Sequence, residues 1–150
     1  MSRAYCRLHF HLVFGTKGRL RTIESPIKEQ LHGYMIGIIR NLGGGVEAIG
    51  GTDDHVHVLF FTPPKFALSE IIATLKASSS KWMHETHSRI HDFAWQRGYG
   101  LFTVSESSVE PVKAYIDNQE EHHRRMTFEE EYIAMLQKHG IEYEPRYVFD

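Results

Sequence analysis

Two histidines separated by one residue, in the segment His55-Val56-His57, are the first feature of this sequence with an obvious chemical use. On a β-strand, alternate side chains share a face, so both imidazoles would lie on one side, roughly 6.6 Å apart along the chain. Two imidazoles at this spacing can bind one metal cation. Asp53 and Asp54 could orient the rings as hydrogen-bond acceptors. A pair of surface histidines without a metal is the simpler alternative, and the spacing alone favours it.

A second histidine pair with the same spacing, His9-Phe10-His11, lies near the start of the sequence. Spacing does not decide which of the two pairs binds a metal. Four histidines on neighbouring strands would also suit zinc. A zinc metallohydrolase is therefore one alternative prediction, with the ligands His9, His11, His55 and His57.

The segment Val109–His123 is a predicted helix with an unusual polar face. That face combines a phenol, two amides and an imidazole at helical spacing: Tyr115, Asn118, Gln119 and His122. For any single tyrosine, a half-buried ring with its hydroxyl in solvent is the simpler reading. Tyrosine can also act as a covalent nucleophile. Attack on a phosphodiester needs a cation to neutralise the charge that develops on oxygen, so a phenol near a metal site predicts phosphodiester chemistry.

Gln119 lies one helical turn after Tyr115 and offers a neutral oxygen ligand. Together with His55 and His57 it would leave positions open for a phosphate oxygen and water. This set has no thiolate and no carboxylate, which disfavours structural zinc. Its donors suit Mg²⁺ or Mn²⁺, and the nitrogen ligands favour Mn²⁺.

A regular order of strands and helices must position these side chains. Apolar and aromatic runs predict the strands, and apolar residues at helical spacing predict the helices. The predicted elements are a strand over Tyr5–Phe14, a helix from Pro26 to the glycines at 43–45, strands over Val46–Gly50 and His55–Thr62, a helix over Leu68–Trp82, a strand over Leu101–Val104, and helices over Val109–His123 and Phe128–Leu136. This order predicts an α+β fold: a ferredoxin-like βαββαβ antiparallel sheet with helices on one face and the other face free for chemistry. C-terminal helices, which carry the candidate nucleophile Tyr115, follow this unit.

The length of 150 residues fits one domain, residues 1–150, of which about 124–150 would form a helical tail. No apolar run reaches the ~18 residues that a membrane span needs, and the first residues lack the pattern of a signal peptide. The single cysteine, Cys6, excludes an internal disulfide and suits a reducing compartment. We therefore expect a cytoplasmic protein without a membrane segment.

The net charge of -2 argues mildly against a nucleic-acid partner, because such domains are often strongly basic. The distribution of charge is uneven, however. The first 22 residues contain no acidic residue and five basic ones: Arg3, Arg7, Lys17, Arg19 and Arg21. The sequence therefore permits a basic surface on an acidic protein.

Several segments, taken in order, resemble the single-tyrosine HUH transposases of small bacterial insertion sequences, a group that includes transposases associated with repetitive extragenic palindromes. The segments are HFHLVFGTKGR, GGTDDHVHVLF, Leu75-Lys76 with Trp82, WQRGYGLFTVS, VKAYIDNQEEHH and FEEEYIAMLQKHGIEY. The resemblance covers nearly the whole chain. Its specificity lies in the order and spacing of the segments and not in any one of them.

The resemblance implies an RRM-like sheet and the HUH metal ligands His55 and His57. Tyr115 matches the nucleophile, and Gln119 matches the third metal ligand. The implied activity is that of a single-stranded DNA transposase, which cleaves and rejoins single-stranded or hairpin DNA through a 5′-phosphotyrosine intermediate. Members of the family act as homodimers in which the tyrosine helix of one subunit can serve the histidine pair of the other. The pair His9 and His11 would then be structural or face the DNA.

Single-stranded or hairpin DNA as substrate makes basic side chains candidates for phosphate contacts. The candidates are Lys17, Arg19, Arg21, Lys76, Lys81, Arg97, Arg124 and Arg125. The alternative function is a non-cleaving, RRM-like nucleic-acid-binding protein derived from a transposase. Such a protein has no chemical need for two histidines, a tyrosine and a glutamine in the positions of a cleavage site.

Overall fold

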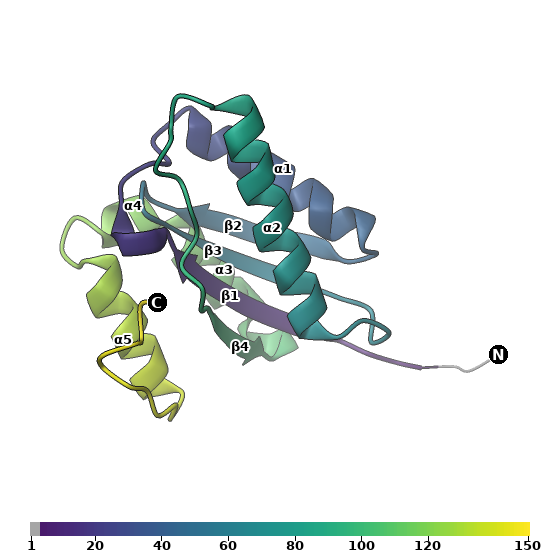
Figure 1. Cartoon of the computed structure of the whole chain (residues 1–150). Helices are drawn as coiled ribbons and strands as arrows, with labels where there is room; N and C mark the ends of the chain where they lie inside the picture. The colour runs from purple at the N-terminus through teal and green to yellow at the C-terminus, as the bar shows by residue number, and fades with distance from the viewer. Residues whose placement is uncertain (1–3) are drawn as a thin grey trace.

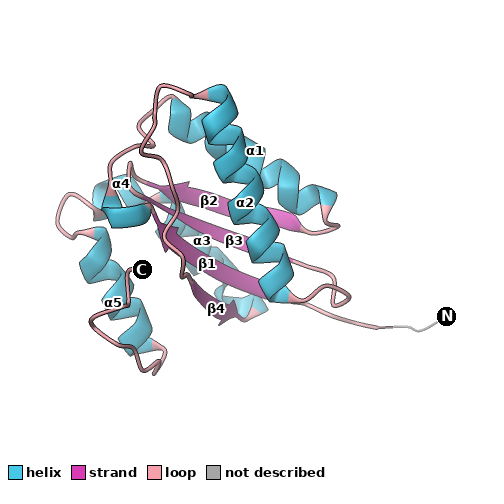
Figure 2. Cartoon of the chain, in the orientation of Figure 1, coloured by secondary structure: helices cyan, strands magenta, loops and turns pink. Residues whose placement is uncertain are grey.

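The computed structural model describes residues 4–150, so Arg3 and the two residues before it lie outside the described part of the predicted domain. The strands are β1 (His9–Gly15), β2 (Gly45–Gly51), β3 (His55–Phe61) and β4 (Gly100–Val104). The helices are α1 (Ile27–Asn41), α2 (Leu68–Thr86), α3 (Val109–Asp117), α4 (Gln119–His122) and α5 (Phe128–Lys138), with short helical turns η1 (Lys17–Arg19) and η2 (Glu106–Ser108) (Figure 1, Figure 2). Among these described residues, no helix has both the length and the apolar character needed to cross a membrane.

The four strands form one antiparallel sheet in the order β2-β3-β1-β4, which confirms the predicted ferredoxin-like topology. The two central strands are β1 and β3. In their register His57 pairs with Val13, and His55 pairs with Gly15. The histidine pair of β3 is therefore held in the middle of the sheet, where both neighbouring strands fix its backbone.

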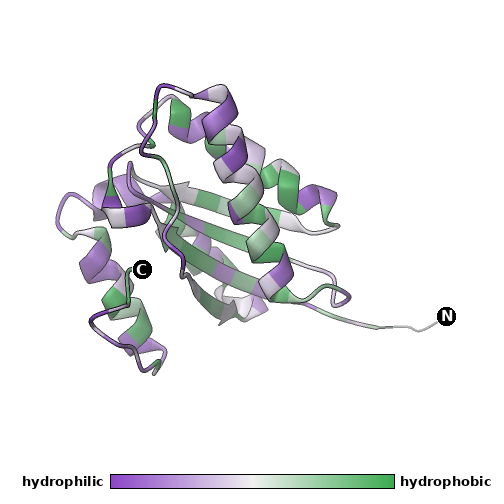
Figure 3. Cartoon of the chain, viewed as in Figure 1, coloured by the Kyte–Doolittle hydropathy of each residue, from purple (hydrophilic) through white to green (hydrophobic). Residues whose placement is uncertain are grey.

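One face of the sheet packs against α1 and α2 (Figure 1). The hydrophobic colouring of the central strands in Figure 3 reflects their apolar side chains. Val56 and Val58 are fully buried on this face and belong to the main core. Because strand side chains alternate, their burial places His55 and His57 on the opposite face, as the sequence predicts.

The opposite face carries the C-terminal helices: α3 and α4 lie against β2 and β3, and α5 packs on side chains of β1 and β4 at one end of the sheet (Figure 1). Ile116 of α3 packs against Leu59 of β3, and Phe128 of α5 packs in a cluster with Val13 of β1. The physical reason is that this face also carries large apolar side chains, whose burial is worth roughly 25 cal/mol per Å². The helices that carry the predicted chemistry thus form the second layer over the sheet.

The first strand begins at His9, and the prediction that it begins at Tyr5 is wrong. Both neighbours of β1 end at this point, since His9 pairs with Phe61 of β3 and with Val104 of β4. Residues 4–8 have no strand beside them, and the backbone carbonyl of Leu8 accepts a hydrogen bond of 3.4 Å from Thr62, just after the end of β3. Tyr5 is accordingly 92% exposed.

The predicted helix Val109–His123 is interrupted at Asn118, which separates α3 from α4. The backbone there takes φ -101 and ψ 19, outside the helical region. Asparagine is a weak helix former, so the break costs little. Because of this break, the polar residues do not share one helical face as the sequence predicts. Gln119 is buried, whereas Asn118 is exposed.

α3 and β2 approach so closely at Gly50 that no side chain fits between them. A Cβ atom at Gly50 would lie 2.4 Å from the carbonyl oxygen of Ile116. This oxygen belongs to the backbone of α3, so it can move only if the helix moves. Gly50 therefore sets the distance between the sheet and the helix that carries Tyr115.

We expect Gly50→Ala to lower the free energy of unfolding by about 1–3 kcal/mol, because the added methyl group overpacks this contact. Gly33→Ala is the matched control: a Cβ at this exposed position of α1 would meet nothing within 4 Å. The control should be stabilising by about 0.4–1 kcal/mol, because alanine restricts the unfolded chain. Urea denaturation measures both values, and equal stability of the two variants would contradict the close approach.

Candidate active site

Tyr115 lies beside the histidine pair of its own chain. The centroid of its ring is 5.8 Å from that of His57 and 6.4 Å from that of His11. α3 carries the phenol across the face of the sheet on which the imidazoles lie. The sequence leaves open whether tyrosine and histidines meet within one chain or between two, and the structure brings them together within one chain.

His55 and His57 are fully buried, and each has its Nδ1 atom in a hydrogen-bond contact. Nδ1 of His55 lies 2.8 Å from Oδ1 of Asp54, and Nδ1 of His57 lies 2.8 Å from Nε2 of His11. Burial lowers the pKa of His57 to about 4, so this imidazole is neutral at physiological pH. These contacts fix the orientation of both rings and direct both Nε2 atoms toward the C-terminal helices.

Gln119, the first residue of α4, is 1% exposed and reaches the same centre. Its Oε1 atom lies 2.8 Å from Nε2 of His55, and its Nε2 atom donates a hydrogen bond of 3.0 Å to Oε2 of Glu131. All four residues singled out by the sequence, two histidines, a tyrosine and a glutamine, are thus in one cluster.

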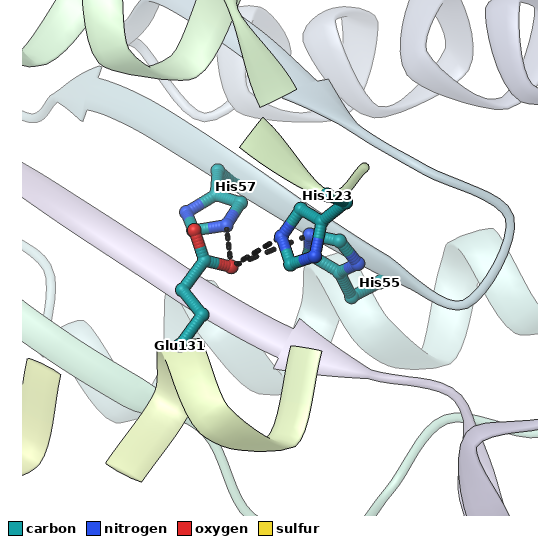
Figure 4. A group of neighbouring side chains, drawn as sticks. All are labelled: His55, His57, His123 and Glu131. Atoms are coloured by element: carbon teal, nitrogen blue, oxygen red, sulfur yellow. Dashed lines mark hydrogen bonds and ion pairs between the residues drawn. The ribbon is translucent and has the colours of Figure 1, made fainter. Parts of the chain in front are cut away.

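The centre of that cluster is Glu131 on α5, which the sequence analysis did not single out (Figure 4). Its Oε1 atom lies 2.9 Å from Nε2 of His57, 2.9 Å from Nε2 of His123 and 3.5 Å from Nε2 of His55. The hydroxyl of Tyr115 donates a hydrogen bond to Oε2. Burial would raise the pKa of Glu131, but the hydrogen bonds from His123 and His57 outweigh it, so the pKa is far below its usual value. The carboxylate is therefore ionised.

His123, which follows α4, is the second residue that the sequence analysis missed. Its Nδ1 atom donates a hydrogen bond of 2.6 Å to the backbone carbonyl of Met126. Burial lowers the pKa of His123, but the hydrogen bond and the charge of Glu131 outweigh it, so the net shift is upward.

One signal in the sequence pointed to Glu131. It lies three residues after Phe128 and directly before Tyr132, on the apolar face of the predicted helix. A carboxylate on such a face is almost never buried without a partner. No comparable pattern distinguishes His123 from its neighbour His122.

The phenol of Tyr115 is a hydrogen-bond donor in this arrangement. Burial raises the pKa of Tyr115, and the hydrogen bond to the Glu131 carboxylate raises it further. The group is therefore protonated at physiological pH, and it must lose its proton if it attacks an electrophile.

The other histidine pair has a different role. His9 lies between two carboxylates, with Nδ1 2.7 Å from Oε1 of Glu47 and Nε2 2.5 Å from Oε2 of Glu106. His11 is a neighbour of His57, as described above. Within residues 4–150, the histidines and acidic residues grouped closely enough to bind a metal are His55, His57, His123 and Glu131, whose ligand atoms lie within 4.8 Å of one another. A zinc site built from His9, His11, His55 and His57 has no support in this geometry.

A cleft of about 690 Å³ gives access to the cluster, and Tyr115 and Glu131 lie in its lining. Its other walls include Phe102 of β4, Met135 of α5 and His139. The cleft thus connects the surface to the phenol and the carboxylate.

The basic residues predicted to contact DNA lie in different settings. Lys76 donates hydrogen bonds of 2.6 to 3.1 Å to the backbone carbonyls of residues 96–98, and burial lowers its pKa to about 8. Arg19 pairs with Glu129 at 3.2 Å. The remaining six are exposed: Lys17, Arg21, Lys81, Arg97, Arg124 and Arg125.

Comparison with known proteins places this chain in a family. Residues 4–119 match the family described as "Transposase IS200 like". The ISDra2 transposase TnpA of Deinococcus radiodurans is 25% identical over 118 residues, which cover 75% of this chain and 84% of that protein. The transposase for insertion sequence element IS200 of Salmonella typhimurium is 33% identical over 72 residues, which span 44% of this chain and only 46% of the relative.

Two solved structures share the fold. A crystal structure of a transposase candidate from Deinococcus radiodurans has a TM-score of 0.63 and 25% identity, covering 79% of this chain and 96% of that one. A REP-associated tyrosine transposase, solved with a REP hairpin, has a TM-score of 0.57 and 14% identity, covering 79% of this chain and 72% of that one. The family match spans well over half of the chain and includes His55, His57, Tyr115 and Gln119. The chain therefore belongs to the IS200-like transposase family and is a single-stranded DNA transposase.

Proposed function

We propose that this transposase cleaves and rejoins single-stranded or hairpin DNA with Tyr115 as the nucleophile, and that His55, His57 and Gln119 bind a divalent cation. The observation that carries the proposal is the meeting of the phenol and the two imidazoles in one buried cluster of a single chain. A nucleophile and a site for a cation at this proximity are what attack on a phosphodiester requires.

The donor atoms in the cluster fit a divalent cation. Imidazole nitrogens and an amide oxygen, without a thiolate, suit Mn²⁺ or Mg²⁺. When bound, the cation neutralises charge on the scissile phosphate and polarises it. Asp54 and His11 contribute by holding the two imidazoles through Nδ1, which keeps both Nε2 atoms available.

The phenolic oxygen of Tyr115 attacks the phosphorus atom, and the bond from phosphorus to the 3′ oxygen breaks. The products are a 5′-phosphotyrosine and a free 3′-hydroxyl. Because its pKa is raised, the phenol loses its proton only as the new bond forms, and the departing 3′ oxygen gains a proton to become the hydroxyl. The phosphotyrosine retains the energy of the phosphodiester, so a second 3′-hydroxyl can attack it and join strands without ATP.

The DNA reaches the phenol through the cleft beside Tyr115, and basic side chains near the site hold its phosphates. Lys17 lies two residues after Gly15, the register partner of His55, and is exposed. Arg124 and Arg125 directly follow His123 and are exposed. The further contacts that we propose are Arg19, Arg21 and Arg97, together with Lys76 and Lys81 of α2, which lies on the opposite face of the sheet. A homodimer remains part of the proposal, although a second subunit is not needed to bring Tyr115 to the histidines.

Tyr115→Phe should abolish the covalent protein–DNA adduct and leave DNA binding unchanged, because only the nucleophilic oxygen is lost. The test is incubation with Mn²⁺ and a pool of hairpin-containing single-stranded oligonucleotides, followed by a denaturing gel. Tyr147→Phe, at an exposed position, is the matched control and should retain the adduct. An adduct that persists in Tyr115→Phe would place the nucleophile elsewhere and refute the proposal.

His57→Ala should reduce the rate of cleavage by more than about tenfold, since even indirect disturbance of a metal ligand costs that much. His9→Ala removes an imidazole that is engaged by Glu47 and Glu106, and it should retain most of the activity. Single-turnover cleavage at a series of Mn²⁺ concentrations compares the two variants. A greater loss in His9→Ala than in His57→Ala would show that the wrong pair has been assigned to the metal.

A further inference from the structure

The Nε2 atoms of His55, His57 and His123 all face the carboxylate of Glu131 (Figure 4). Only the first two of these histidines belong to β3. The third, His123, lies as close to Glu131 Oε1 as His57 does, at 2.9 Å. The family match ends at residue 119, so both His123 and Glu131 lie beyond the part of the chain that it covers.

The hydrogen bonds on the far side of these rings decide where their protons are. Nδ1 of His55 contacts a carboxylate oxygen of Asp54, and Nδ1 of His123 contacts the carbonyl oxygen of Met126. Both oxygens can only accept, so both Nδ1 atoms carry a proton. In a neutral imidazole the Nε2 atom then has a lone pair and no proton. In that neutral form, the lone pairs are directed at the centre of the cluster.

Without a metal, the Nε2–H groups of His57 and His123 donate hydrogen bonds of 2.9 Å to the Glu131 carboxylate. A divalent cation can replace these protons, because the ligand atoms of His55, His57, His123 and Glu131 lie within 4.8 Å of one another. A cation satisfies all the donors at once. The carboxylate also supplies the negative charge that two histidines and a glutamine lack.

We propose that His123 and Glu131 are further ligands of the divalent cation, which adds a third imidazole and a carboxylate to the proposed ligands His55, His57 and Gln119. This inference rests on the proposed function, because it takes those three residues as the other ligands. Gln119 keeps its oxygen beside His55 and steadies the carboxylate through its amide group, which donates to Oε2.

The additional ligands change which ion the site prefers. A set dominated by imidazole nitrogen selects first-row transition ions such as Mn²⁺, Co²⁺ and Zn²⁺, whereas Mg²⁺ prefers oxygen ligands and retains its water. Because its ligands come from β3, from the end of α4 and from α5, the cation also ties the C-terminal helix to the sheet. Metal binding should therefore stabilise the folded chain.

Co²⁺ alone, titrated into the full chain and followed by visible absorption, tests this inference without requiring catalysis. We expect Glu131→Gln and His123→Ala each to weaken Co²⁺ binding by more than about tenfold. Excess Mg²⁺ should not displace the bound Co²⁺. Thermal unfolding with and without Co²⁺ is the second measurement, and the metal should raise the Tm of the unaltered chain more than that of either variant.

Matched controls separate loss of a ligand from general damage. Glu130→Gln changes the neighbouring carboxylate and retains a side chain able to cap α5 at Thr127, and His91→Ala removes an exposed imidazole. Both should bind Co²⁺ normally. Circular dichroism of the metal-free variants verifies that each is folded.

His57→Ala distinguishes failure of this inference from failure of the proposed function. If His57→Ala loses Co²⁺ while Glu131→Gln and His123→Ala bind it as before, the two additional ligands are refuted and the metal role of the histidine pair stands. Tighter binding by Glu131→Gln would likewise refute the inference, since the carboxylate would then compete with the ion. If Co²⁺ binding does not depend on His57, the proposed metal site is wrong and the inference is refuted with it.

Discussion

The ionised carboxylate of Glu131 is buried, so groups that compensate its charge must surround it. Removing one partner of a buried charge typically costs about 3–5 kcal/mol. The compensating groups come from β3, α3, α4 and the segment before α5. Because all of them must reach one carboxylate, its charge constrains the positions of α3, α4 and α5 on the sheet. The same side chain receives the hydrogen bond of the Tyr115 phenol. The position of the Tyr115 phenol and the stability of the C-terminal helices on the sheet therefore depend on the same carboxylate.

The two faces of the sheet differ: one packs in the hydrophobic core, and the other carries the histidines of the cluster. On β3, Val56 and Val58 enter the core beneath α1 and α2, which holds the backbone of the strand rigid. The alternating histidines are presented to the other layer from that rigid backbone. Two local features position the C-terminal helices. The absence of a side chain at Gly50 lets α3 approach β2 closely, and the helix break at Asn118 directs Gln119 toward the histidines.

The match to the IS200-like family covers residues 4–119, a range that includes the two histidines, the tyrosine and the glutamine. The remaining part of the chain adds a helix that covers the site and brings a carboxylate and an imidazole to it. The cluster therefore includes groups able to bind a metal that lie outside the residues matched to the family. The approach to it is a cleft lined by residues of β4, α3 and α5.

The sequence by itself determined what depends on local periodicity. Strand alternation put His55 and His57 on one face, and helical spacing put Tyr115 and Gln119 one turn apart, because both follow from backbone geometry over a few residues. Only the tertiary structure decided where β1 begins, which layer covers the histidine face, and that tyrosine and histidines meet within one chain. It alone revealed His123 and Glu131 at the centre. These features depend on contacts between segments that are far apart in the chain. Packing and the compensation of a buried charge decide such contacts, and local sequence patterns do not.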